Sequence, residues 1–118
     1  MLAKNEIGIY VHIPFCKKKC DYCDFISYCN KDNLIEKYVE AMKKEIESQN
    51  IKPEITTIYI GGGTPSYIDS KYIIQIINKI KEKNVSPNAE ITIEVNPGTV
   101  TMEKLEDYRS CGINRISI

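Results

Sequence analysis

The feature of this sequence that most constrains its fold is a regular alternation of short apolar runs with amphipathic helical patterns. Each apolar run is rich in β-branched residues and is short enough to be a strand. The predicted strands are residues 7–13, 56–60, 90–95 and 115–118. Strands that alternate with helices pair in parallel through right-handed crossovers, so this order predicts an α/β fold with a parallel sheet covered on both faces. A doubly wound sheet and the first part of a (β/α) barrel both fit.

Three helices are predicted between these strands. The first starts at a capping-box-like pair, Asn33 and Glu36, and continues to Asn50. The second begins near Asp69 or Ser70 and ends at Asn84, and the third is capped by Thr101 and ends at Gly112. Their apolar positions recur at helical spacing. These positions are Ile35, Tyr38, Val39, Met42 and Ile46, then Ile73, Ile74, Ile77 and Ile80, then Leu105, Tyr108 and Cys111.

Composition and charge exclude several classes of protein. The chain has 118 residues, 42% of them hydrophobic, which is ordinary for one globular domain, and we expect residues 1–118 to form a single domain. Sixteen basic residues balance sixteen acidic ones, so the sequence predicts no nucleic-acid or anionic-membrane partner. No apolar run approaches the roughly 20 residues of a membrane span, and the start lacks a signal-peptide pattern. We therefore expect a cytoplasmic protein.

Two connections stand out because ligand sites in parallel α/β folds lie at the carboxyl ends of the strands. The connection after the first strand, residues 14–32, is much longer than the usual length of about 2 to 6 residues. It contains four of the five cysteines: Cys16, Cys20, Cys23 and Cys29. The glycine run of residues 61–63 follows the second strand directly. Both features are expected at the same edge of the sheet.

The spacing of Cys16, Cys20 and Cys23 favours an iron–sulfur cluster. One loop can hold three corners of a [4Fe–4S] cubane in this way and leave the fourth iron open to a small molecule. A zinc site is the alternative, but structural zinc sites usually have two separated cysteine pairs, and here there is one triplet and a single histidine, His12. With Cys29 as a fourth ligand, the spacing matches neither common ferredoxin pattern. We interpret Cys29 as a loop thiol and Cys111 as a small buried residue.

The segment around the cysteines resembles a known family. It reads Tyr10-Val11-His12-Ile13-Pro14-Phe15-Cys16-Lys17-Lys18-Lys19-Cys20-Asp21-Tyr22-Cys23-Asp24-Phe25. This is similar to the cluster loop of radical S-adenosylmethionine (SAM) proteins, specifically the oxygen-independent coproporphyrinogen III oxidase-like family. The resemblance implies that the fold is the first part of a partial TIM barrel and that the open iron binds SAM. It also implies that one electron from the cluster cleaves SAM to methionine and a 5′-deoxyadenosyl radical.

The resemblance extends to the second and third strands. Residues 61–65 could form only a tight turn, but they resemble the second motif of the family, which implies that Gly62, Gly63 and Thr64 contact SAM. Alternation directs Glu94 to one face of a buried strand, where a carboxylate needs a partner. A structural salt bridge is one reading. The match of residues 93–99 to the family implies instead that Glu94 binds SAM.

Three further residues are candidates near the cluster. Tyr10 and His12 share a face of the first strand by alternation. The resemblance implies that Tyr10 contacts SAM, whereas we expect His12 to be a hydrogen-bonded core histidine. Tyr22 lies between two cysteines, where the resemblance implies that its ring shields the cluster or touches a second SAM molecule.

The family includes two functions of different kinds. One is oxidative decarboxylation of coproporphyrinogen III, and the other is a heme chaperone that passes heme to acceptor proteins. Asp24-Phe25 after the third cysteine resembles the chaperone branch. A metal-binding module without catalysis is a third hypothesis, and the electron donor and heme acceptor are not specified.

The sequence resembles only the amino-terminal part of the family barrel. We therefore expect heme-binding residues to lie beyond Ile118, and we expect the chain alone to have little turnover. We also expect an exposed apolar edge at its last strand.

Overall fold

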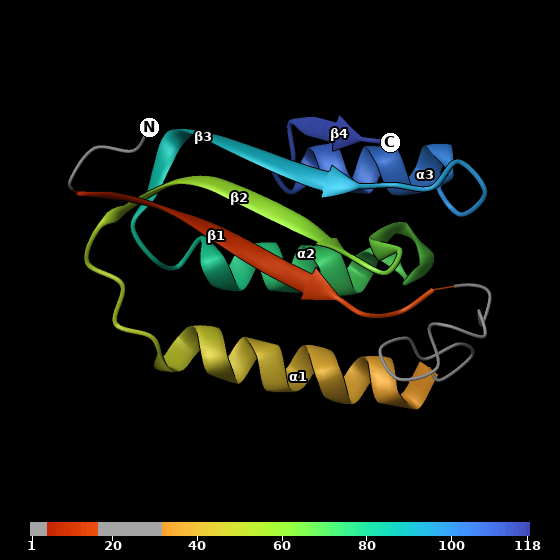
Figure 1. Ribbon diagram of the computed structural model, residues 1–118, viewed down its shortest axis with the longest axis horizontal. Coiled ribbons are helices and arrows are strands. Elements are labelled where there is room, and N and C mark those ends of the chain that lie inside the picture. Colours follow the sequence, from red (N-terminus) through yellow and green to blue (C-terminus); the bar gives the residue numbers. More distant parts are fainter. Residues whose placement is uncertain (1–4, 17–31) are drawn as a thin grey trace.

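The computed structural model describes residues 5–16 and 32–118. Strands and helices alternate throughout (Figure 1). The strands are β1 (Glu6–Ile13), β2 (Glu54–Gly62), β3 (Val85–Glu94) and β4 (Arg115–Ser117), and the helices are α1 (Asp32–Ser48), α2 (Ser70–Ile80) and α3 (Met102–Ser110). A short 3₁₀ turn, η2 (Pro65–Tyr67), follows β2. The predicted α/β fold is confirmed.

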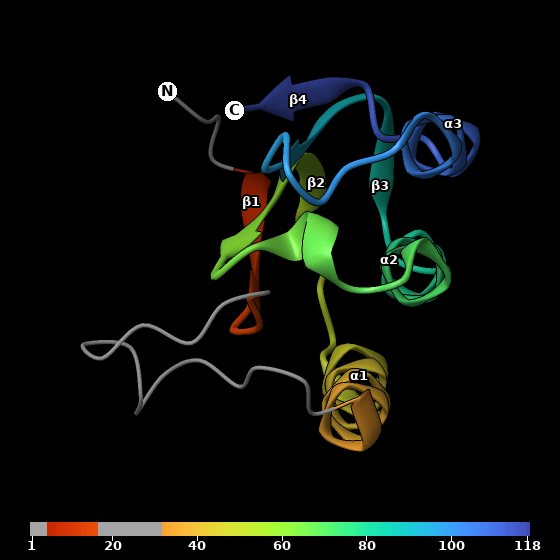
Figure 2. The ribbon, with the colours of Figure 1, turned by 90° about the vertical axis from the view of Figure 1, so that its right-hand side faces the viewer.

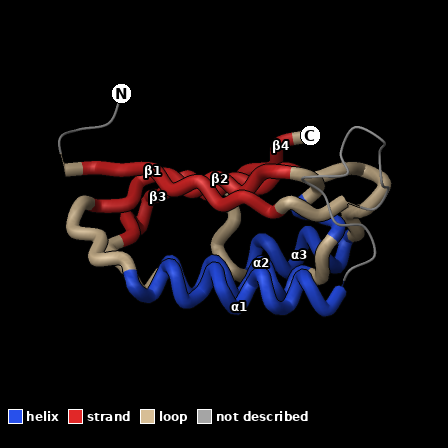
Figure 3. Tube along the Cα trace, turned by 60° about the horizontal axis from the view of Figure 1, so that its bottom comes forward, coloured by secondary structure: helices blue, strands red, loops and turns tan. Residues whose placement is uncertain are grey.

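The sheet topology decides between the two architectures that the sequence allows. The four strands are parallel and lie in the order β1-β2-β3-β4, so each strand pairs with its neighbour along the chain. All three helices lie on one face of the sheet (Figure 3). The order of a doubly wound sheet reverses at a switch point, whereas a barrel keeps consecutive strands adjacent and its helices outside. The structure is therefore the start of a (β/α) barrel.

The prediction that both faces of the sheet are covered does not hold among the described residues, because the helices cover one face only (Figure 3). Among the described residues, the face opposite α1, α2 and α3 carries no helix, and we call it the open face (Figure 3). A strand is expected to be buried on both sides only where the residues that face each side are apolar. Here β1 and β2 place Tyr10 and Tyr59 on the open face, so their alternation indicates one covered side.

The core fills the space between the sheet and the helices. Its fully buried residues come from all the longer elements: Val11, Ile13, Ile55, Ile58, Ile60, Ile91 and Ile93 of the strands, and Ile35, Val39, Ile73, Ile76, Ile77, Ile80 and Tyr108 of the helices. Burial of a large aliphatic side chain contributes about 1.5–3 kcal/mol, so this isoleucine-rich layer is what holds the sheet and helices together.

The starts of α2 and α3 follow the predicted caps, whereas α1 begins at Asp32, so the predicted capping residue Asn33 lies inside the helix. The Asp69 side chain accepts a hydrogen bond from the Lys71 amide at 2.9 Å, and the Thr101 hydroxyl accepts one from the Lys104 amide at 3.1 Å. Gly112 follows α3 with a φ of 109°, which favours glycine. The second helix ends at Ile80, four residues before the predicted end at Asn84.

The strands β1, β2 and β3 all start before the predicted residues, and in β2 and β3 an irregular pairing separates the added first residues from the rest of the strand. The register of β2 shifts between Ile55 and Thr57, which leaves Thr56 as an extra residue. In β3, Val85 pairs with Ile55 and Glu90 pairs with Thr57, so residues 86–89 bulge out between them. Pro87 lies in this bulge, and because proline is rare inside strands the sequence pattern did not predict the start of β3.

The last strand exposes apolar surface, as expected. Ile116 is 40% exposed and Ile118 is 92% exposed. A groove of about 530 Å³ lies beside them, between β4 and α3, and includes Leu105 and Ile113 in its lining.

Candidate functional site

The candidate site lies at the carboxyl ends of the strands, the end of the sheet toward which Figure 2 is turned. Strand pairing aligns His12 with Gly61 and Glu94 with Ser117, and the register of β2 and β3 places Gly61 beside Glu94. The result is a row of residues across all four strands on the open face. Parallel pairing therefore brings Gly61, Glu94 and His12 together, although up to 82 positions separate them along the chain.

The glycine turn after β2 packs directly on the end of β1. The Gly63 amide donates to the Ile13 carbonyl oxygen at 2.8 Å, and the Thr64 amide donates to the Phe15 carbonyl oxygen at 2.7 Å. A Cβ at Gly63 would lie 2.7 Å from that Phe15 oxygen, so only glycine permits the approach. These contacts fasten the glycine turn to the residue that precedes Cys16.

Gly62 needs to be glycine for a second reason. Its φ is 124°, a conformation that side chains rarely adopt, and a Cβ there would lie 2.6 Å from the Ile13 carbonyl oxygen. A tight turn alone does not require such a close approach to another strand.

Glu94 is half-buried and points over Gly61 on the open face. Its Oε2 atom accepts a hydrogen bond from the Tyr59 hydroxyl at 2.7 Å, and its Oε1 atom accepts one from the Gly62 amide at 3.3 Å. In the part of the chain that the structure describes, the partners of this carboxylate are thus a hydroxyl and an amide. The salt bridge considered from the sequence is not found there.

Tyr10 and His12 share the open face of β1, as alternation predicts. The Tyr10 hydroxyl and His12 Nδ1 lie 3.0 Å apart within hydrogen-bonding distance, and the Tyr10 ring stacks on the Tyr59 ring with a centroid separation of 6.1 Å. Burial, and then the negative charge of Glu94, raise the pKa of Tyr10. Tyr10 is 59% exposed, which leaves its ring accessible to a ligand.

The prediction of a core histidine at position 12 is wrong. His12 has the expected hydrogen-bond partner, but its side chain is exposed, because it lies on the open face rather than against the helices. A strand that is apolar at alternate positions buries only one of its two sides. His12 belongs to the candidate site.

A second set of contacts fastens the turn after β2 to the loop after β3. The buried Ser66 hydroxyl accepts a hydrogen bond from the Asn96 amide at 2.9 Å and lies 2.5 Å from the Thr99 hydroxyl. The Lys104 ammonium group, from α3, donates to the carbonyl oxygens of Ser66 and Thr99 at 2.5 and 3.2 Å. Burial lowers the pKa of Lys104. The turn that follows the glycines and the loop that follows Glu94 are thus held against each other.

The cysteines are only partly covered by the structure. Cys16 is described and is half-buried at the end of β1. Cys20, Cys23, Cys29 and Tyr22 lie outside the described residues, so their predicted roles stay predictions. Among residues 5–16 and 32–118, no group of three or more His, Cys, Asp or Glu side chains could hold a metal ion.

Cys111 is buried, as predicted, and burial raises the pKa of its thiol. The thiol donates to the Tyr108 carbonyl oxygen at 3.2 Å. Cys111 therefore behaves as a small core residue.

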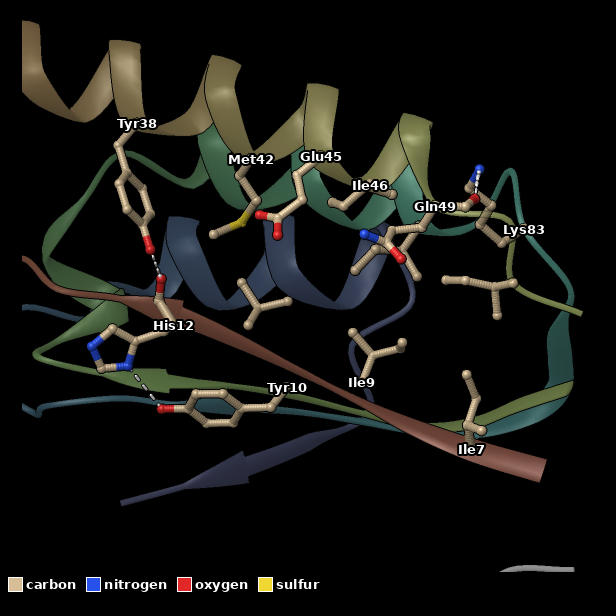
Figure 4. Close-up of a pocket in the computed structure, with 13 residues that line it drawn as sticks. Ile7, Ile9, Tyr10, His12, Tyr38, Met42, Glu45, Ile46, Gln49 and Lys83 are labelled. Atoms are coloured by element: carbon tan, nitrogen blue, oxygen red, sulfur yellow. Dashed lines mark hydrogen bonds between the residues drawn. The ribbon is translucent and has the colours of Figure 1, made fainter. Parts of the chain in front are cut away.

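A hollow of about 190 Å³ opens beside the glycine turn and Glu94. Its lining is mostly polar and comes from the ends of three strands: Gly63, Thr64, Pro65, Glu94, Val95, Asn96, Ser117 and Ile118. A larger groove of about 460 Å³ lies between β1 and α1 (Figure 4). That groove runs along the edge of β1, where Tyr10 and His12 also line it, and Ile7, Ile9 and Met42 make it largely apolar. The smaller hollow places the Glu94 carboxylate beside the close backbone approach of the glycine turn.

Sequence reasoning missed Tyr59 and Ser117. Tyr59 precedes Gly61 by two residues and therefore lies on the same face of β2, so the alternation of the strand could have predicted its place in the site. Ser117 becomes visible only once the register of β3 and β4 aligns it with Glu94.

The parallel sheet, one-sided helices and glycine turn define the first β/α units of a barrel whose site lies at the strand ends. Residues 10–118 match the radical SAM superfamily, and the chain belongs to that family. None of the described helices has the length and apolar character needed to cross a membrane.

Known relatives cover the whole of this chain but are longer. The chain is 47% identical over 123 residues to the heme chaperone HemW of Buchnera aphidicola subsp. Schizaphis graminum, with 100% of the chain and 33% of that protein covered. It is 37% identical to HemW of Escherichia coli K12, with 100% and 32% covered. The chain thus spans about a third of the length of these relatives.

A solved structure has the same fold. The coproporphyrinogen III oxidase (HemN) of Escherichia coli, a radical SAM enzyme, superposes with a TM-score of 0.82 at 30% identity, covering 92% of this chain and 26% of that one. This similarity confirms that the sheet is the start of a radical SAM barrel.

The described residues fit the SAM molecule that the family implies. SAM carries a sulfonium and an ammonium group, and Glu94 offers a half-buried carboxylate beside a turn of glycines without side chains. The first predicted cluster ligand, Cys16, follows Phe15, whose carbonyl oxygen is bonded to the same turn. The chemistry and the position of these groups both suit a cationic ligand next to a cluster.

Proposed function

We propose that this chain forms the cluster- and SAM-binding part of a radical SAM protein that handles heme. The observation that carries the proposal is the bond between the Thr64 amide and the Phe15 carbonyl oxygen. It holds the start of the cysteine segment against the glycine turn, beside the Glu94 carboxylate. A cluster bound after Phe15 would then lie next to a site for a positively charged molecule.

In this proposal Cys16, Cys20 and Cys23 hold a [4Fe–4S] cluster and leave one iron open for SAM. When bound, the cluster and SAM supply one-electron chemistry. The residues of this chain bind and orient the cofactor. Glu94 and the backbone of Gly62 and Gly63 hold its cationic end, and Thr64 lies beside them.

Tyr10 lines the same site, with its exposed ring stacked on Tyr59 and its hydroxyl beside His12. We also propose that Tyr22, between two of the cysteines, shields the cluster. The electron donor is not identified by any residue here.

The heme chaperone function is favoured over the oxidase. The relatives from Buchnera and Escherichia coli are named as heme chaperones, and Asp24-Phe25 after the third cysteine resembles that branch. The structural neighbour is an oxidase, which shares the barrel and so does not decide between the two. Heme binding, its acceptor proteins and a cytoplasmic location belong to this proposal for the whole protein.

Anaerobic reconstitution with iron and sulfide tests the cluster. We expect Cys16→Ala, Cys20→Ala and Cys23→Ala each to abolish the [4Fe–4S] absorption and electron paramagnetic resonance signals, and Cys29→Ala to leave them unchanged. Added SAM should change the resonance spectrum of the reduced cluster, because it binds the open iron. Zinc in the anaerobic protein, or equal losses for Cys29→Ala and Cys20→Ala, would refute this ligand set.

Heme titration of the intact protein separates the two functions. We expect stoichiometric heme binding and transfer, with no conversion of coproporphyrinogen III under reducing conditions with SAM. Turnover of coproporphyrinogen III would assign the oxidase function instead. A cluster that forms but responds to neither SAM nor heme would indicate a metal-binding module.

A further inference from the structure

Tyr59 occupies the centre of the candidate site, although neither the cysteine motif nor the glycine motif includes it. It lies on β2, two residues before Gly61, and is half-buried on the open face. Its ring stacks on Tyr10 on one side, with an angle of 16° between the ring planes, and its hydroxyl reaches Glu94 on the other side. Tyr59 is therefore the link between β1 and β3 at this end of the sheet.

We propose that Tyr59 is a positioning residue that fixes the Glu94 carboxylate and leaves its Oε1 atom for the positively charged part of SAM. This inference rests on the proposed function, because it assumes that Glu94 binds SAM.

The two oxygens of Glu94 are held unequally. The Tyr59 hydroxyl donates to Oε2 at 2.7 Å, the usual length for such a bond to a carboxylate. The Gly62 amide reaches Oε1 at 3.3 Å, which is long for an amide donor. Each carboxylate oxygen can accept about two hydrogen bonds, and the bond that Oε1 accepts is the weaker of the two, so Oε1 is the oxygen that a ligand engages more readily.

Fixing Glu94 before SAM arrives favours binding. A glutamate side chain has several rotatable bonds, and ordering them during binding would reduce affinity. The hydrogen bond from Tyr59 selects one orientation in advance. The stacked ring of Tyr10 in turn restricts the ring of Tyr59, so the hydroxyl stays aimed at Glu94.

The glycine at position 61 makes this contact possible. A Cβ at Gly61 would lie 3.0 Å from both Glu94 Oε1 and Tyr59 Cε1. Because Gly61 has no side chain, the Tyr59 ring and the Glu94 carboxylate have room to meet above it. The absence of a side chain also keeps Oε1 next to the glycine turn.

The test measures SAM binding to the intact protein after anaerobic cluster reconstitution, by equilibrium dialysis. The variants are Tyr59→Phe, Glu94→Gln and the double variant, and Tyr72→Phe is the matched control on α2, where the ring lies beside Lys71. Tyr59→Phe should weaken SAM binding by about three- to tenfold, because the Glu94 side chain must then be ordered during binding. In the Glu94→Gln background the same change should have little further effect.

A structural role would give a different pattern. If Tyr59 only supported packing, Tyr59→Phe would be silent and Tyr59→Leu, which also removes the ring, would weaken binding. Equal effects of Tyr59→Phe with and without Glu94 would likewise overturn the proposal. At saturating SAM, Tyr59→Phe should reach the same resonance spectrum as the unsubstituted protein, because Tyr59 positions Glu94 and leaves the binding mode unchanged.

Failure of the proposed function gives a separate result. If the cluster-loaded protein does not bind SAM, or Glu94→Gln does not weaken binding, then Glu94 is not a SAM ligand and both proposals fall. If Glu94→Gln weakens binding and Tyr59→Phe does not, only the role of Tyr59 is refuted. Iron and sulfide content and circular dichroism should match among all variants, which confirms that each one folds.

Discussion

The Lys104 ammonium group donates a hydrogen bond to the Ser66 carbonyl oxygen at 2.5 Å, so the first turn of α3 is fastened to the 3₁₀ turn that follows β2. The same group reaches the Thr99 carbonyl oxygen in the loop after β3. One side chain outside the cysteine and glycine motifs thus connects the two loops that form the candidate site.

Replacing Lys104 by methionine should loosen both loops. The carbonyl oxygens of Ser66 and Thr99 lose their common donor, and we expect a loss of about 1–2 kcal/mol in the free energy of unfolding. Urea unfolding measures this change. Lys71→Met on the surface of α2 is the control, and an equal loss there would contradict the special role of Lys104.

Replacing Gly62 by alanine should destabilise the turn and impair SAM binding together. The φ of 124° and the contact of a Cβ with the Ile13 carbonyl oxygen both oppose a side chain. We expect a cost of about 1–3 kcal/mol, measured by thermal unfolding. Among the described residues, a Cβ at Gly98 would meet the Asn96 side chain alone, so Gly98→Ala should cost clearly less.

Replacing Tyr108 by phenylalanine should be neutral or stabilising by up to about 1 kcal/mol. The Tyr108 hydroxyl is buried, and no described residue offers it a hydrogen bond. Urea unfolding at pH 7 tests this point. A clear loss of stability would show that the hydroxyl has a partner.

The same residue predicts a pH dependence. Burial raises the pKa of Tyr108 to about 12, from 10.0 in the unfolded chain. Between these values the folded state binds more protons than the unfolded state, so stability is complete below pH 10 and is lost as the pH rises toward 12. Tyr108→Phe should lose less stability over this range than the unsubstituted protein. Identical alkaline curves for the two would contradict the shift.

Replacing Tyr38 by phenylalanine should weaken the attachment of α1 to β1. The Tyr38 hydroxyl donates to the His12 carbonyl oxygen at 2.5 Å (Figure 4). The Tyr38 ring also meets the Phe15 ring edge to face. We expect a loss of about 1 kcal/mol and faster hydrogen exchange at the end of β1. Tyr72→Phe should leave both measurements unchanged.

The sequence predicted those parts of the fold that local pattern determines. Alternation and helical spacing located all four strands and three helices, and the caps at Asp69 and Thr101 are where the sequence placed them. The start of β3 was missed because a bulge around Pro87 interrupts the pattern. The exposure of the open face was not predicted, because an apolar run does not indicate which side of a strand packs against a helix.

The candidate site was predictable where a motif marks it. Gly62, Gly63 and Glu94 lie together at the strand ends, where their motifs predicted them, whereas no motif predicted the exposed position of His12. Tyr59 and Lys104 act through contacts between segments more than 30 positions apart. Such contacts depend on register and on helix placement, which no local pattern encodes.

The consecutive order of the strands bears on how the chain assembles. Every pairing in the sheet joins strands that are neighbours in sequence. During translation β1 is therefore already synthesised when β2 leaves the ribosome, and the same holds for the partners of β3 and β4. Each pairing closes one helical crossover, which is a shorter closure than a pairing between strands that are not neighbours in sequence. The sheet can therefore grow one strand at a time during translation, with the glycine turn reaching β1 as soon as β2 has docked.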